Sequence, residues 1–214
     1  MKSNNILALV ALLSLAACGG GGGSGGSGKE NPQRELIEAT PGTYYTVLRP
    51  VNIQSNGFIP YGAATFTLKD DQLQVSVSMD DDQAVNHRQT LHLGSRCPTA
   101  ADDTNGDNFI DYNEAMAVVS EVLMPLDADL NSQAAGSEIY PRGRSMTYSK
   151  SALLSNINAD LMQTMGKKIG FIGRVILIHG TSANSVFPSS LASHNNEPAH
   201  LSLPVVCGVL EKIE

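Results

Sequence analysis

ATFTLKDDQLQVSVSM, residues 64–79, alternates apolar with polar residues on both sides of the acidic pair Asp70-Asp71. Alternation with a period of two, in threonine, valine and phenylalanine, is typical of β-strands that bury one face. Aspartate favours tight turns because its side chain can bond the nearby backbone. This stretch therefore predicts two strands with Asp70-Asp71 at the corner between them.

Strand-like patterns continue on both sides of this stretch. Residues 43–53 (TYYTVLRPVNI) precede it, and Asn56-Gly57 predicts a further corner. The end of the chain has the same character in GFIGRVILIHG (170–180) and AHLSLPVVCGVLEKI (199–213). Threonine, valine and aromatic residues in runs of this length predict strands.

Helical spacing of apolar residues is confined to two places. YNEAMAVVSEVLMPL (112–126) stops at Pro125, and SKSALLSNINADLMQTMG (149–166) ends at a glycine. Strands at both ends with helices between them predict a mainly-β fold, an antiparallel β-sandwich that carries two short helical segments.

The N-terminus has the build of a secretory signal. ILALVALLSLAA (6–17) is too short to span a bilayer and follows a single positive charge at Lys2. Leu15-Ala16-Ala17-Cys18 resembles the lipobox of bacterial lipoproteins, which implies a signal peptide at 1–17 and lipidation of Cys18. The expected location is then the bacterial cell envelope, anchored to the outer membrane on its periplasmic or surface side. The alternative is an ordinary signal peptide with an incidental cysteine.

Residues 18–34 form a glycine- and serine-rich tether, and residues 35–214 are predicted to form one domain.

The formal net charge is -7, and the basic residues are scattered. Nucleic acid and anionic membrane surfaces are therefore poor partners, which leaves the lipid anchor and an envelope or extracellular protein. Asp80-Asp81-Asp82 is expected to form a solvated hairpin turn.

Cys97 and Cys207 remain as an even pair once Cys18 is assigned to lipid. In an oxidising compartment a disulfide is the expected outcome, and a loop of more than a hundred residues would be stabilised by about 4.7 kcal/mol in the chain-entropy model. Two unpaired thiols are the alternative.

Residues 103–114 (DTNGDNFIDYNE) resemble the calcium loop of EF-hand proteins over all twelve positions. That loop needs oxygen ligands at positions one, three, five, seven, nine and twelve. The resemblance assigns these positions to Asp103, Asn105, Asp107, the carbonyl of Phe109, Asp111 through a water, and Glu114. Hard oxygen ligands favour calcium over transition metals. An acidic turn that binds no ion is the alternative.

The loop departs from the EF-hand pattern at position six, where Asn108 replaces the glycine that a positive φ demands. Ile110 supplies the apolar anchor expected at position eight. Cys97-Pro98 leaves little room for an entering helix, so we expect a loop with a helix on one side only, within the insertion 97–125. Loops of this kind in extracellular modules bind calcium at about 10⁻⁴ to 10⁻³ M.

GRVILIHG (173–180), LPVVCGVL (203–210) and LHLGSRC (91–97) together resemble the copper/zinc superoxide dismutase family. The chordin-type domains are a neighbouring possibility, and the order of the motifs also resembles a group of uncharacterised secreted bacterial proteins. The resemblance implies a Greek-key β-sandwich and a disulfide between Cys97 and Cys207.

The enzymatic residues of that family carry over poorly. His92 and His179 fall on copper ligands, but Thr90 stands where the first histidine of His-x-His is expected, and Pro204 replaces the arginine that guides superoxide. No histidine lies between Cys97 and His179, so the bridging and zinc ligands have no counterpart. His87 would face away from His92 on a strand, while His194 and His200 are expected at the surface.

Two hypotheses follow. The first is a non-enzymatic, lipid-anchored β-sandwich that binds calcium and has a structural or interaction role. The second is a copper-dependent redox protein that uses His92 and His179.

Overall fold

The computed structural model describes residues 37–53, 57–81, 85–133 and 139–214, all of them within the unit Asn31–Glu214. The predicted signal peptide, Cys18, the tether and Asn56 lie outside the described residues. Among the helices that are described, none is long and apolar enough to cross a membrane.

The hairpin predicted around Asp70-Asp71 is confirmed. Strands β2 (Tyr61–Lys69) and β3 (Gln72–Asp80) pair in antiparallel fashion, and the pair Lys69 and Gln72 closes the turn. Asp70 takes a φ of 54° at the corner. Buried and exposed residues alternate along β3, so one face of this hairpin contacts the core, as the sequence pattern indicated.

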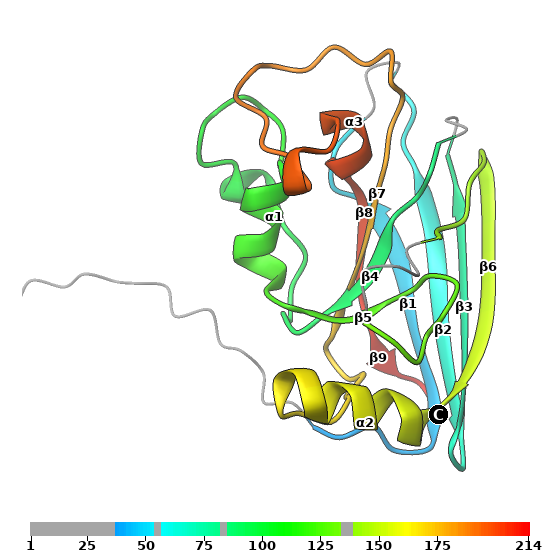
Figure 1. Cartoon of the computed structure of the whole chain (residues 1–214). Helices are drawn as coiled ribbons and strands as arrows, with labels where there is room; N and C mark the ends of the chain where they lie inside the picture. The colour runs from blue at the N-terminus through cyan, green and yellow to red at the C-terminus, as the bar shows by residue number, and fades with distance from the viewer. Residues whose placement is uncertain (1–36, 54–56, 82–84, 134–138) are drawn as a thin grey trace, which may run out of the picture. The chain divides into compact units, whose positions relative to one another are not determined.

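Nine strands of the described chain form an antiparallel sheet in the order β5-β4-β7-β8-β1-β2-β3-β6, with β9 paired to β1 (Figure 1). The remaining strands are β1 (Gly42–Pro50), β4 (Gln89–His92), β5 (Val122–Pro125), β6 (Ser145–Leu153), β7 (Val175–His179), β8 (Pro204–Val209) and β9 (Glu211–Lys212). The later strand β8 lies beside β1 of the β1-β2-β3 meander.

Strand β1 joins the two halves of this sheet. Its first part pairs with β2, whereas Arg49 and Pro50 pair with Cys207 and Val206 of β8. The main core contains residues from both halves, so the sheet encloses it as a sandwich does. The mainly-β antiparallel fold class is therefore confirmed.

Phe171 lies near the centre of the main core, with its ring centroid 5.2 Å from Tyr44 and 5.4 Å from Phe66. Helix α2 (Leu154–Met165) adds Ile157 and Leu161 to the same cluster. In Figure 1 this helix lies across one end of the sheet, close to β9.

A second, smaller core lies on the opposite face of β7 and β8. Helix α1 (Tyr112–Val119) and the loop before it pack there, so that Ile110, Ala115, Val118 and Val119 contact Val175, Leu177 and Cys207. Because both faces of β7 are covered, all five of its residues are buried. This accounts for the uninterrupted apolar run in VILIH.

Three predicted segment boundaries were wrong. Helix α1 ends at Val119 because Ser120 takes a φ of 64°, and Val122–Pro125 forms β5 beside β4 instead of a further helical turn. The first residues of the second predicted helix belong to β6, which pairs with β3 along its whole length. In the last segment, Ala199–Ser202 is the short helix α3 rather than strand.

Candidate calcium site

The twelve-residue loop 103–114 follows a single 3-10 turn, η1 (Ala100–Asp102), and its last three residues form the first turn of helix α1. The start of the loop is fixed by Arg96, whose guanidinium donates two hydrogen bonds of 2.8 and 2.7 Å to the carboxylate of Asp102. These bonds to Arg96 lower the pKa of Asp102 to about 2. The bidentate ion pair between Arg96 and Asp102 thus precedes the loop, in the place of the entering helix of an EF-hand.

Asp103, at position one, organises the first half of the loop. Its Oδ1 accepts a hydrogen bond of 2.7 Å from the backbone N–H of Gly106, and its Oδ2 accepts one of 2.8 Å from Asn108. Asn108 adopts a φ of 67°, the left-handed conformation expected at position six. The backbone therefore turns sharply around the Asp103 carboxylate.

Positions three and five repeat the same kind of contact. The Oδ1 of Asn105 accepts a bond of 2.9 Å from Asp107 N–H, and the Oδ1 of Asp107 accepts one of 2.9 Å from Phe109 N–H. Such side-chain to backbone turns keep the oxygens on the concave side of a tight loop.

Glu114, at position twelve, is buried and reaches back from α1 into the loop. Its Oε1 accepts hydrogen bonds from the backbone N–H and the hydroxyl of Thr104, at 2.6 and 2.8 Å, and from Asn105 N–H at 3.3 Å. Its Oε2 accepts a bond of 3.0 Å from Asp111 N–H. The last position of the loop is thus tied directly to its beginning.

Asp111, at position nine, is the N-cap of α1. Its Oδ1 accepts a hydrogen bond of 3.0 Å from Glu114 N–H, and Glu114 returns the contact in a capping box. A carboxylate at this position also interacts favourably with the helix dipole.

The donor chemistry and backbone of this loop suit a hard cation, but its carboxylates are held by N–H groups. Among the described residues, no three His, Cys, Asp or Glu side chains gather closely enough to hold a metal ion. Calcium binding at these positions would require the carboxylates to exchange some of their N–H bonds for the cation.

Asn52 is the contact that sequence reasoning missed. Its carboxamide accepts a bond of 2.9 Å from Ile110 N–H and donates one of 2.9 Å to Ile110 O, and it also donates one of 2.8 Å to Pro204 O. The side chain is buried, so it satisfies both main-chain groups of the apolar position of the loop. Nothing in the sequence could indicate this contact, because the partners are 58 residues apart.

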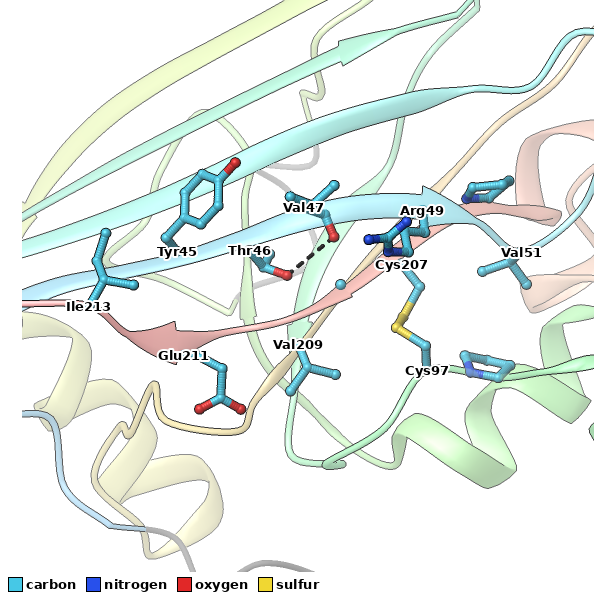
Figure 2. A pocket seen from close by; sticks show the side chains of 13 residues that line it. Tyr45, Thr46, Val47, Arg49, Val51, Cys97, Cys207, Val209, Glu211 and Ile213 are labelled. Carbon is cyan, nitrogen blue, oxygen red and sulfur yellow. Dashed lines mark hydrogen bonds between the residues drawn. A yellow bond between two sulfur atoms is a disulfide. The ribbon is translucent and has the colours of Figure 1, made fainter.

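The predicted disulfide between Cys97 and Cys207 is confirmed, with a Cα–Cα distance of 5.8 Å. It fastens the segment before the loop 103–114 to strand β8. Figure 2 shows this bond at one side of a groove of about 610 Å³ that is open to solvent. Side chains of β1, including Tyr45, Val47 and Arg49, form the other side.

The two histidines expected as copper ligands are both buried on the sheet. Thr90 and His92 form a hydrogen bond of 2.7 Å between Oγ1 and Nε2, and His92 Nδ1 lies 3.0 Å from Ser120 O. Burial lowers the pKa of His92 to about 4, although the Ser120 carbonyl acts in the opposite direction. Both nitrogens of His92 thus have a protein partner.

His179 differs in one respect, since its Nε2 has no hydrogen-bond partner among the described residues. Its Nδ1 lies 3.3 Å from Arg88 O. Burial, followed by the positive charge of Arg88, lowers the pKa of His179 to about 3. The ring of Tyr112 lies 6.1 Å from the His179 ring and 4.8 Å from that of His194.

The acidic run Asp80-Asp81-Asp82 is not wholly solvated, so that prediction needs correction. Asp81 is buried, and its Oδ2 lies 3.8 Å from the Nε2 of His87, whose ring is also buried. Both His87 nitrogens face backbone carbonyls, those of His179 at 3.3 Å and Gly143 at 3.2 Å. Asp82 lies outside the described residues.

The chain matches no protein-family model and no curated protein sequence.

Proposed function

We propose that this protein is a calcium-binding lipoprotein of the bacterial cell envelope, with a structural or interaction role and no enzymatic activity. The observation that carries the proposal is the bonding of the loop 103–114. The carboxylate of Asp103 accepts hydrogen bonds from two main-chain N–H groups of the loop, and Asn108 takes the left-handed conformation that position six requires. Calcium is the cation that this set of hard oxygen ligands suits.

The fold proposed for the domain is a superoxide dismutase-like β-sandwich with degenerate catalytic residues. The antiparallel strand pairing around a shared core and the disulfide from Cys97 to β8 support this view. Leu15-Ala16-Ala17-Cys18 supports a lipid anchor. The acidic net charge argues for a protein partner rather than nucleic acid.

A calcium titration followed by thermal unfolding tests the proposal. If the site binds at about 10⁻⁴ M, calcium at a hundred times that concentration should stabilise the protein by about 2.7 kcal/mol, whereas magnesium should do less. Glu114→Gln or Asp103→Ala should abolish the calcium-dependent shift. Glu121→Gln is the matched control, because Glu121 is outside the loop and pairs with Lys167 at the surface. A wild-type melting temperature that ignores calcium would refute the assignment.

A copper-dependent redox protein is the second candidate, supported by the unpartnered Nε2 of His179. Copper would supply one-electron chemistry, and His92 and His179 would hold it. Against this, the Nε2 of His92 is bonded to Thr90, which stands where the family would place another ligand. Elemental analysis of the purified protein separates the candidates: stoichiometric copper with dismutation would overturn the first.

A further inference from the structure

The calcium loop is covered by a segment that lies far away in the sequence. Residues 187–194, here called the covering segment, lie between β7 and α3. The hydroxyl of Ser190 donates a hydrogen bond of 2.6 Å to Asp107 Oδ2, and Ala192 N–H donates one of 2.9 Å to Asp111 Oδ2. Two of the expected calcium ligands therefore hold this segment.

Aromatic contacts extend the same interface. The rings of Phe109 and Phe187 meet edge to face with centroids 5.8 Å apart, and Tyr112 packs against His194 at 4.8 Å. Tyr112 N–H also donates a bond of 3.4 Å to Ala192 O. The contacts thus run along the loop from position five to the first residue of α1.

Asp107 and Asp111 each divide their two oxygens between the loop and the covering segment. Asp107 Oδ1 accepts from Phe109 N–H, and Asp111 Oδ1 accepts from Glu114 N–H, while the Oδ2 of each bonds the segment. A carboxylate is planar, so any reorientation of one oxygen toward a cation moves the other. The position of the covering segment and the binding of a cation in the loop should therefore affect each other through these two carboxylates.

Asn52 holds the loop from the opposite side. Its three hydrogen bonds connect the main chain of Ile110 to Pro204 at the start of β8. Ile110 lies between Phe109 and Asp111, so Asn52 fixes the orientation of the carbonyl and the carboxylate expected to bind calcium on either side of it. Groups that orient metal ligands in this way tune metal affinity.

We propose that Asn52 and Ser190 are positioning residues of the calcium loop, and that calcium in turn fixes the covering segment 187–194. This inference rests on the proposed calcium function. Linkage requires the effect to be reciprocal: if the segment favours calcium binding, calcium must stabilise the bound position of the segment by the same factor.

Calcium affinity by calorimetry and hydrogen exchange of peptides from 187–194 test the proposal together. In the wild type, calcium should slow exchange in the covering segment. Ser190→Ala should weaken calcium binding by about tenfold and remove most of that protection. Ser182→Ala is the matched control, because the Ser182 hydroxyl bonds only Asn184 N–H among its described hydrogen bonds and its loss should leave both measurements as in the wild type.

Asn52→Leu should also weaken calcium binding by at least about tenfold, measured at a temperature where the variant is fully folded. Gln89→Met is its control. Gln89 is a buried amide that donates a bond of 2.8 Å to Leu126 O, away from the loop, so its loss should lower stability but leave calcium affinity unchanged. A purely structural role for Asn52 predicts that both variants keep the wild-type affinity.

The outcomes distinguish this inference from the function on which it rests. Calcium binding by the wild type with no change in exchange at 187–194, or unchanged affinity in Ser190→Ala and Asn52→Leu, would overturn the inference alone. Absence of calcium binding in the wild type would overturn the proposed function itself.

Discussion

The proposed calcium loop, residues 103–114, and the buried histidines are the two regions of the described chain whose residues suggest a metal. In the loop, the carboxylates of Asp103 and Glu114 accept several hydrogen bonds from main-chain N–H groups. In the sheet, His92 has both of its nitrogens paired with protein groups, and one nitrogen of His179 has no partner among the described residues. The loop presents anionic oxygens, whereas the sheet presents neutral rings.

The two regions also differ in how deeply their polar side chains are buried. The predicted side-chain ligands at positions one, three and five of the loop are exposed or half-buried, so water or a cation can replace an N–H partner at modest cost. The histidines are buried, and burial penalises the charged form of each ring. The loop is therefore the better candidate for reversible ion binding.

The largest expected effect comes from breaking the covalent link between these regions. Cys97 precedes the calcium loop, and Cys207 lies opposite Leu177 of β7. Replacing both cysteines by alanine should lower the free energy of unfolding by about 2–5 kcal/mol, because the bridge constrains the unfolded chain. Urea denaturation measures this loss.

Cys18→Ser is the control for that experiment, since Cys18 takes no part in the bridge. It should leave the urea midpoint of the domain unchanged. An unchanged midpoint in the doubly substituted variant would mean that packing alone fastens the calcium loop to β8.

Acid should lower the free energy of unfolding through the two buried histidines. His92 and His179 have folded-state pKa values of about 4 and 3, below the 6.5 of an unperturbed histidine. As the pH falls from 6.5 toward 4, the unfolded chain therefore binds protons that the folded chain does not. Each histidine should lower stability by about 1.4 kcal/mol per pH unit in that window, and neither should contribute a slope above it.

His92→Gln should remove about half of this pH dependence, and chemical denaturation at several pH values would reveal it. Thr90→Ser is the control, because it keeps the hydroxyl that bonds His92 and adds no titrating group. A slope that is the same in His92→Gln as in the wild type would show that other groups account for the acid sensitivity.

The sequence predicted the parts of the fold that depend on local pattern or on counting. Alternation over residues 64–79 identified the hairpin, and the even cysteine pair identified the disulfide. The end of α1 was not predictable from spacing, because Val122–Pro125 is a strand only through its pairing with β4. Short apolar runs carry no such information.

The candidate site divides in the same way. The twelve positions of the loop are contiguous, so their residue types could be compared with a known pattern. Asn52 and Ser190 contact the loop from 58 and 83 residues away, and isolated polar residues at such distances give no signal in one sequence. The burial of Asp81 was missed for a different reason: an aspartate in an acidic run is usually solvated, and its nearby partner His87 gives no sign in the sequence that both side chains are buried.

The smallest expected effect tests the backbone of the loop rather than its ligands. Asn108 has a φ of 67°, and asparagine tolerates this conformation better than alanine does. Asn108→Ala should therefore lower stability by about 1 kcal/mol, while Asn108→Gly should change it by less than about 0.5 kcal/mol, because relief of strain offsets the greater freedom of the unfolded chain. Asn113→Ala is the control in the exposed face of α1, where alanine is the better helix former and should be neutral or stabilising by up to about 0.5 kcal/mol. Equal effects of alanine at the two asparagines would show that Asn108 does not hold the left-handed conformation in solution. The loop would then be an acidic turn without the fixed geometry that the buried histidines have.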